Sequence, residues 1–284
     1  MWCHHLLLRR STRMPRSVFG CAISLAVLLT CPSAGRAQTW NAPGLNALEF
    51  KAVPPGGPAP RRDLTGIWDG GGAGVGGAGQ EAEREAARAP FTPLGEQMVK
   101  GNKPGNGPRM VPVAEINDPL STLGDPSGFP RLLTFELRAV QIVHTPNQVL
   151  MLYMFEKRWR VIWTDGRPLP KDPDPRWYGY SVGRWEDDST FVVETVGLDD
   201  RTWLDNSGNP HSTALRVVER YRRVSQNTLE LTVVLDDPTV YTKPWMARNR
   251  LPLKAVPPGT DLMEMIPSAS EAQAYQQFIS NPTK

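Results

Sequence analysis

The sequence predicts a mainly β protein, in which an antiparallel up-and-down meander of eight or nine strands closes into a barrel with short flanking helices. Two observations lead to this prediction. From residue 131 onward the chain contains successive short runs rich in Val, Ile, Leu and aromatic residues, which are typical of strands. Short turn signals such as Thr145-Pro146-Asn147 separate most of these runs, and no helical pattern recurs between them. Sequential hairpins in this number are enough to close a small barrel.

The same patterns divide the chain into a small number of parts. They are a leader at 1–37, a Pro- and Gly-rich arm at 38–63, a single barrel domain at 64–258 with a loop-rich insertion at 70–130, and a partly helical tail at 259–284. Within the insertion, short helices are expected at 81–88 and 92–100, where Pro93 suits a first helical turn. The six prolines of residues 101–130 favour a segment that wraps over the surface.

The strands can be placed one by one from their composition and the turns between them. They are expected at 138–144, 149–156, 159–164, 180–186, 190–197, 214–223 and 228–236, with one more around Trp68 and a last one near 251–254. Because side chains alternate between the two faces of a strand, each run also predicts which residues face the core.

One acidic residue falls on an apolar face. In the hairpin of 214–223 and 228–236, Glu219 shares its face with Leu215, Val217 and Tyr221. An inward carboxylate is costly unless it is paired or neutral. We therefore expect an internal ion pair with an arginine, for which Arg160, Arg167 and Arg184 are candidates. A catalytic or ligand-binding acid with a raised pKa is the alternative.

The leader has the organisation of a secretory signal. A basic stretch at Arg9–Arg16 precedes an apolar run at 18–29 and small residues that end at Ala37. The run is too short to cross a bilayer, so we expect an exported protein, periplasmic or extracellular, without a transmembrane segment. A weaker alternative is a lipid anchor on Cys31, since Leu28-Leu29-Thr30-Cys31 loosely resembles a lipobox. Either Met1 or Met14 fits as the first residue.

Charge and cysteine content exclude several classes of function. The formal charge is +3, but residues 1–37 hold five arginines and no acid, so the remainder has 27 basic and 29 acidic residues. The basic balance thus belongs to the leader, and no nucleic-acid binding is expected. All three cysteines also lie in the leader, which excludes a disulfide, a thiolate nucleophile or a Cys-ligated zinc site in the body.

No cofactor or metal is expected either. With only His144 and His211 beyond the leader, a three-His metal centre cannot form within one chain. Gly72-Ala73-Gly74-Val75-Gly76-Gly77 matches the dinucleotide-binding pattern. That match has little meaning, because seven of the ten residues at 70–79 are glycine and the parallel βαβ context is missing.

Two resemblances add to this interpretation. Thr65-Gly66-Ile67-Trp68 resembles the Gly-x-Trp that opens the first strand of lipocalin-like barrels, which bind small apolar ligands. A second set of motifs resembles an uncharacterised group of exported bacterial proteins over about residues 90–255. The motifs that carry this second resemblance include Trp163-Thr164-Asp165-Gly166-Arg167, Asp172-Pro173-Asp174-Pro175-Arg176-Trp177, Thr202-Trp203-Leu204-Asp205 and Pro210-His211-Ser212. The second resemblance implies secretion and a β-rich fold, but no reaction.

The loops between strands supply the candidate site residues. His211 could act as a general base oriented by Asp205 or Glu219, because imidazole titrates near neutral pH and a carboxylate fixes its tautomer. The alternative is a self-bonded loop in which Asp205 caps backbone amides and His211 packs.

A second group of candidates would contact a ligand rather than transfer a proton. Arg167 could bind an anionic group beside Asp165, although Asp165-Gly166-Arg167 also fits a simple turn. Trp163, Trp177 and Trp203 lie beside loops and are the better tryptophans for a ligand surface. The stiff segment around Trp177 is either such a rim or a rigid connection whose Trp plugs the barrel end.

These features favour an exported small-molecule-binding barrel for an apolar or aromatic ligand or a sugar. Such a barrel would have an interior lined by apolar strand faces. One alternative is a cofactor-independent hydrolase, lyase or isomerase that uses His211 with Asp205 or Glu219. Another is an envelope interaction protein that holds its partner with the Pro/Gly arm and the 101–130 segment.

Overall fold

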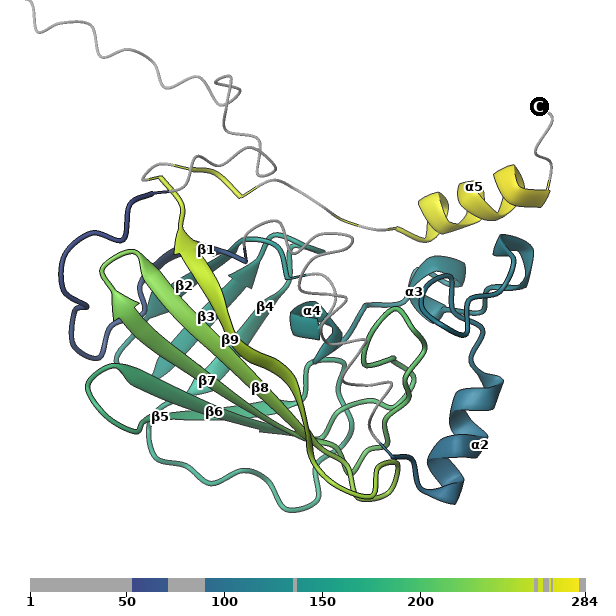
Figure 1. The fold of residues 1–284 in the computed structure, drawn as a ribbon, viewed down its shortest axis with the longest axis horizontal. Coiled ribbons are helices and arrows are strands. Elements are labelled where there is room, and N and C mark those ends of the chain that lie inside the picture. The colour runs from purple at the N-terminus through teal and green to yellow at the C-terminus, as the bar shows by residue number, and fades with distance from the viewer. Residues whose placement is uncertain are drawn as a thin grey trace, which may run out of the picture. The chain divides into compact units, whose positions relative to one another are not determined.

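A closed barrel of nine strands forms the centre of the protein (Figure 1). The computed structural model describes residues 53–70, 90–134, 137–257, 260–262, 266 and 268–280. The strands follow chain order around the barrel. They are β1 (Gly66–Asp69), β2 (Val140–His144), β3 (Gln148–Tyr153), β4 (Trp159–Trp163), β5 (Tyr180–Trp185), β6 (Thr190–Val196), β7 (Arg216–Ser225), β8 (Thr228–Asp236) and β9 (Trp245–Ala255). The predicted β-barrel class is therefore confirmed.

The barrel departs from a simple meander at one place. Neighbouring strands pair antiparallel, except that β4 and β5 pair in parallel through Ile162 with Ser181 and Trp163 with Val182. Strands that alternate in direction around a ring return to their starting direction only if their number is even. Nine strands therefore require a parallel neighbour pair. Since every other neighbour pair is antiparallel, including the closing pair of β1 and β9, the exception falls between β4 and β5.

This parallel pair dictates the path of the chain between the two strands. Residues 164–179, here called the crossover, must return from the end of β4 to the opposite end of the barrel, where β5 begins. The crossover is anchored just beyond the end of β6 by the close approach of Pro173 to Gly197, where a Cβ atom would lie 2.7 Å from the proline ring. The predicted uninterrupted meander is thus replaced by a rigid connection at this point.

The inward faces of the strands are packed with side chains. The inward side chains of β7 and of the residue before it are at most 1% exposed; they are Leu215, Val217 and Tyr221. The same holds for the side chains that face them from β8, which are Leu229, Leu231, Val233 and Leu235. Arg216, Arg220 and Arg222 lie on the exposed outer face. Both faces match the alternation expected from the sequence.

The strand predicted near 251–254 begins earlier, at Trp245, and shifts in register against β8. Such a bulge breaks the period-2 pattern by which a strand is recognised.

Loops and short helices cover both barrel ends. At one end, residues 54–57 of the arm bond to the β7–β8 turn, where Asn227 donates its backbone N–H to the Pro55 carbonyl. Arg62 bonds in the same way to Asp188 in the β5–β6 turn. At the other end, α4 (Arg131–Thr134) is fully buried, and Arg248 of β9 donates to the carbonyls of Leu133 and Thr134.

The remaining helices lie outside the barrel. The predicted helix at 92–100 is confirmed as α2 (Pro93–Gly101), with Thr92 as its N-cap and Pro93 in the first turn. The predicted tail helix is α5 (Ala269–Ser280), and the 101–130 segment contains η1 (Val113–Glu115) and α3 (Pro119–Thr122). The helix predicted at 81–88 and the leader lie outside the described residues. Among the residues that the structure describes, no helix has the length and apolar character to cross a membrane.

Candidate functional site

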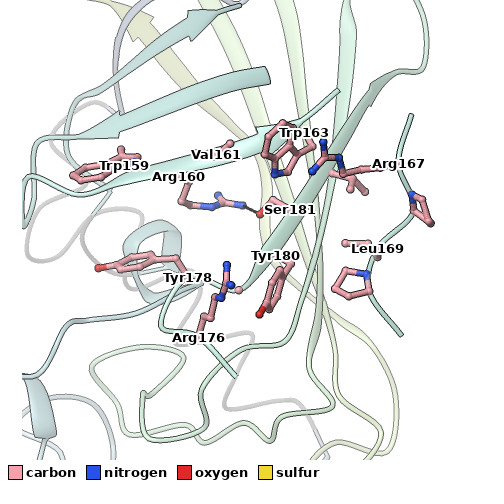
Figure 2. Close-up of a pocket in the computed structure, with 14 residues that line it drawn as sticks. Trp159, Arg160, Val161, Trp163, Arg167, Leu169, Arg176, Tyr178, Tyr180 and Ser181 are labelled. Atoms are coloured by element: carbon pink, nitrogen blue, oxygen red, sulfur yellow. Dashed lines mark hydrogen bonds between the residues drawn. The ribbon is translucent and has the colours of Figure 1, made fainter. Parts of the chain in front are cut away.

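A pocket of about 450 Å³ lies where β4, β5 and the crossover meet (Figure 2). The parallel pairing of β4 with β5 involves only two residues of each strand, so residues 159–161 of β4 are not paired with β5. Residues from both faces of β4 consequently reach this crossover pocket. The lining consists of Trp159, Arg160, Val161, Trp163, Arg167, Pro168, Leu169, Pro170, Arg176, Tyr178, Gly179, Tyr180, Ser181 and Val182.

Two arginines of the crossover lie on aromatic rings of the adjoining strands. The Arg167 guanidinium lies 3.5 Å from the centre of the Trp163 ring, and that of Arg176 lies 4.1 Å from the centre of the Tyr180 ring. Figure 2 shows the Trp163 and Arg167 pair above Arg160 in this view and the Arg176 and Tyr180 pair below it. Stacking of this kind orients a guanidinium while its N–H edge remains able to donate hydrogen bonds.

The floor of the crossover pocket belongs to a buried polar network inside the barrel. Arg160 donates to both carboxylate oxygens of Glu219, at 2.8 and 3.1 Å, and both side chains are almost completely buried. It also donates to the hydroxyls of Tyr153, Ser181 and Thr195 at 3.1 Å. The internal ion pair predicted for Glu219 is therefore confirmed, with Arg160 as the partner.

The electrostatics of this network hold its charges in place. Burial alone would lower the pKa of Arg160, but the Glu219 carboxylate together with Tyr153 and Tyr221 outweighs that effect and raises the pKa above the ordinary value. Burial raises the pKa of Tyr221 well above its usual range, so the hydroxyl stays protonated and donates to Glu219 at 2.7 Å. Glu219 thus has three donor contacts on its two oxygens, which identifies it as the counter-ion of Arg160.

Three of the predicted ligand-contact residues come together at the crossover pocket. Trp163 and Arg167 line it, and Asp165 holds the Arg167 guanidinium through contacts as short as 2.6 Å. Gly166 has a φ of 84°, as the turn interpretation of this segment requires. Trp177 lies outside the lining, where it packs under Arg201 at 4.3 Å.

Comparison with known proteins identifies no relative. No family model matches the chain, and no curated protein or solved structure is significantly similar to it. The β-rich fold implied by the two resemblances is present. Membership of a particular family stays a prediction.

Sequence reasoning overlooked several residues of the crossover pocket. Trp159 and Tyr180 are not among the candidates, Tyr178 enters only as part of the stiff segment around Trp177, and Arg160 enters only as a partner for Glu219. A signal was present in the crossover, where prolines at 168, 170, 173 and 175 alternate with charged and aromatic residues. Such a sequence predicts a stiff surface segment, but not the strand against which that segment packs.

His211 lies in a different part of the structure, and its ring is completely buried. Its Nδ1 lies 3.0 Å from the Ser212 carbonyl oxygen, which can only accept, so Nδ1 carries the proton. Nε2 lies 2.8 Å from the Thr202 hydroxyl, which also donates to the Asp199 carbonyl at 3.1 Å. Burial lowers the pKa of His211 and so favours the neutral imidazole, which the Ser212 carbonyl orients.

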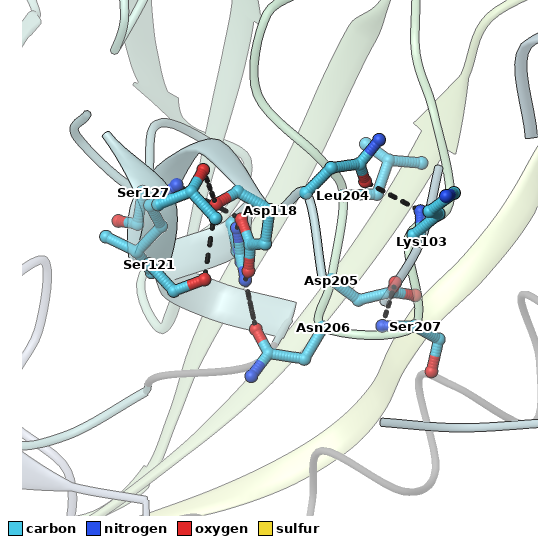
Figure 3. A network of polar contacts seen from close by, with 12 residues as sticks. Lys103, Asp118, Ser121, Ser127, Leu204, Asp205, Asn206 and Ser207 are labelled. Atoms are coloured by element: carbon cyan, nitrogen blue, oxygen red, sulfur yellow. Dashed lines mark hydrogen bonds and ion pairs between the residues drawn. The ribbon is translucent and has the colours of Figure 1, made fainter. Parts of the chain in front are cut away.

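The two acids predicted to orient His211 bond elsewhere. Asp205 accepts from the backbone N–H groups of Ser207 and Asn209 and from the Asn209 side chain (Figure 3). Glu219 pairs with Arg160 as described above. The structure therefore does not bring His211, Asp205 and Glu219 together by hydrogen bonds. The catalytic role of His211 stays a prediction.

Trp203, the last predicted ligand contact, lines a separate pocket of about 430 Å³ among the loops at the barrel end. Thr202, the hydrogen-bond partner of His211, lines the same pocket beside Asp200 and Arg201. The Trp203 ring is 5% exposed and lies 5.7 Å from the Arg131 guanidinium. Arg131 in turn is paired with Asp118, which Figure 3 labels, and bonds to Asn206. These contacts hold the loops together.

Stability is expected to fall as the pH drops below the ordinary histidine pKa of about 6.5. Burial lowers the pKa of both His144 and His211 in the folded protein, and His144 Nε2 accepts from the Leu64 backbone N–H at 3.1 Å. The unfolded chain therefore binds protons first, and stability is lost between about pH 6.5 and the lowered folded values. Each histidine contributes at most about 1.4 kcal/mol per pH unit.

Urea unfolding at pH 7.5 and 5.5 measures this effect. The drop in unfolding free energy between the two pH values should shrink in a His211→Gln variant, whose side chain does not titrate. An unchanged drop in that variant would contradict the assignment of His211 as a group held neutral by burial.

Proposed function

We propose that the protein binds a small apolar or aromatic molecule in the crossover pocket. The observation that carries this proposal is the convergence of four aromatic side chains, Trp159, Trp163, Tyr178 and Tyr180, on one pocket. Its volume of about 450 Å³ lies within the range of small-molecule sites, which are mostly apolar with a few convergent polar groups. Trp159 is 65% exposed, and an exposed indole at such a site can stack on a ligand ring.

The walls of the crossover pocket support this proposal because they are preorganised. The prolines of the crossover restrict its backbone. Gly179 has a φ of 60°, and a Cβ atom there would lie 2.6 Å from the Val196 carbonyl oxygen. The crossover is thereby held tightly against β6. A wall that is already ordered loses little conformational entropy when a ligand binds.

The interior of the barrel offers less support as the ligand site. The apolar strand faces expected to line a cavity pack against one another, with Phe129 and the α4 residues Leu132 and Leu133 completing the same core. Lipocalin-like barrels, which the sequence resembles, hold their ligands inside. We therefore locate the proposed site on the barrel wall. Because a secretory leader is predicted at residues 1–37, we also propose that binding takes place outside the cytoplasm.

Calorimetry with an aromatic probe tests the proposal. We expect naphthalene-2-carboxylate to bind the purified protein, and Trp163→Ala to weaken that binding about tenfold, because a stacking surface and its buried area are lost. Trp177→Ala is the matched control, since Trp177 lies outside the lining and its loss should change the affinity less than twofold. Equal weakening by both variants would move the site away from the crossover pocket.

A further inference from the structure

We propose that the ligand of the crossover pocket carries an anionic group, such as a carboxylate on an aromatic body, and that Arg176 binds this group. The proposal rests on the proposed function and specifies its ligand class. It starts from the charges of the lining, which includes Arg160, Arg167 and Arg176 but no aspartate or glutamate. A neutral aromatic ligand would not require three guanidinium groups around one pocket.

The three arginines differ in whether an acid neutralises them. Arg160 is paired with Glu219 and Arg167 with Asp165. Within the described ranges, Arg176 forms no ion pair, and its guanidinium contacts the Tyr180 ring. It is also solvent-exposed, so an incoming ligand can reach it. Arg176 is therefore the lining cation whose charge is available to a ligand.

The acids that touch the lining already have partners of their own. Besides Glu219 and Asp165, Glu156 lies behind Tyr178 and accepts from its hydroxyl at 2.5 Å. The second oxygen of Glu156 accepts from the Ser127 backbone N–H at 2.6 Å. These carboxylates are held by other donors, and none of them forms an ion pair with Arg176.

A second donor lies at the floor of the crossover pocket. Arg160 Nε is buried and has no hydrogen-bond partner among the described residues, although its two terminal nitrogens have five contacts. A buried N–H without a partner costs free energy, and a ligand oxygen could satisfy it only if the side chains at the floor moved to admit it. As it stands, the pocket offers a cation at Arg176 beside aromatic walls.

Three probes of nearly equal shape test the charge preference. Naphthalene-2-carboxylate, naphthalene-2-carboxamide and 2-(aminomethyl)naphthalene are titrated calorimetrically into wild type, Arg176→Gln, Arg176→Lys and the control Arg184→Gln. Arg184 is exposed on β5, pairs with Glu194 and lies outside the lining. Circular dichroism and thermal melting of each variant verify that it is folded.

We expect the carboxylate to bind wild type and the control about three- to tenfold more tightly than the amide, because a charge-assisted contact with an exposed arginine is partly screened by water. Arg176→Gln should reduce this preference to less than about twofold while the amide binds as before. Arg176→Lys should retain part of it, since lysine keeps the charge but not the planar fork.

Each other outcome has a defined meaning. Equal binding of carboxylate and amide to wild type would overturn the anionic ligand class but leave the proposed function standing. An undiminished preference in Arg176→Gln would overturn the role of Arg176. Failure of all three probes to bind would contradict the proposed function and the ligand class together.

Discussion

Replacing Glu219 by alanine is expected to lower the free energy of unfolding by about 3–5 kcal/mol, because it leaves the guanidinium of Arg160 buried without a counter-ion. The Arg160 side chain is 1% exposed, and no other carboxylate forms an ion pair with it in the described part of the chain. Loss of Glu219 also removes the acceptor of the Tyr221 hydroxyl. Urea unfolding at pH 7.5 measures the change.

Two further variants separate loss of charge pairing from loss of packing. The double variant Arg160→Met with Glu219→Leu should recover at least half of the lost stability, because an apolar pair of similar volume can replace a buried ion pair. Glu186→Ala is the surface control. Glu186 is 51% exposed and lies 3.6 Å from Arg220, so its loss should cost less than about 1 kcal/mol. A double variant no more stable than Glu219→Ala would show that burial of an unpaired charge is not the cause.

Replacing Trp68 by alanine is expected to cost about 3–5 kcal/mol, the range for truncating a large buried aromatic residue. Trp68 is 1% exposed and donates its Nε1–H to the Leu64 carbonyl at 2.8 Å. The Arg223 guanidinium lies 4.9 Å from its ring centre. Trp68 also belongs to the short strand β1, which closes the barrel through two residue pairs with β9. A cavity at this position therefore weakens the closure of the sheet.

Chemical unfolding of two comparison variants tests the explanation. Trp68→Phe retains most of the buried volume but loses the N–H donor, so its cost should be smaller than that of alanine. Trp159→Ala removes the same side chain from an outward position that is 65% exposed and should cost less than about 1 kcal/mol. Similar losses at positions 68 and 159 would refute the role of Trp68 in closing the barrel.

Much of the barrel could be predicted because its signals are local. Hairpins joined by short turns need only neighbouring residues for their recognition, and strand ends mostly agree with expectation within two or three residues. The inward position of Glu219 followed from alternation along a single strand. The choice of its partner among three arginines did not follow from the sequence, because Arg160 and Glu219 are 59 residues apart. Their contact depends on how β4 and β7 face each other across the closed barrel.

The candidate sites likewise depend on contacts between residues that are far apart in the sequence. Sequence proximity suggested that His211 and Asp205 act together, but each has short-range partners of its own, Ser212 for the imidazole and Asn209 for the carboxylate. Trp163, Trp177 and Trp203 were grouped because each lies beside a loop. The fold separates them, since Trp163 lines the crossover pocket and Trp203 lines the separate pocket among the loops at the barrel end.

By itself, the sequence determined the strands, their inward and outward faces, the cysteine-free body and the need for a buried partner of Glu219. Each of these depends on composition or on a period of two along one segment. Tertiary structure alone decided where the crossover pocket lies. A ring of nine strands requires a parallel pair, which here is that of β4 and β5, and the crossover that this pair needs brings Arg176 and Tyr180 to the same pocket as Trp163. Closure is a property of all nine strands together, so no local pattern could have revealed it.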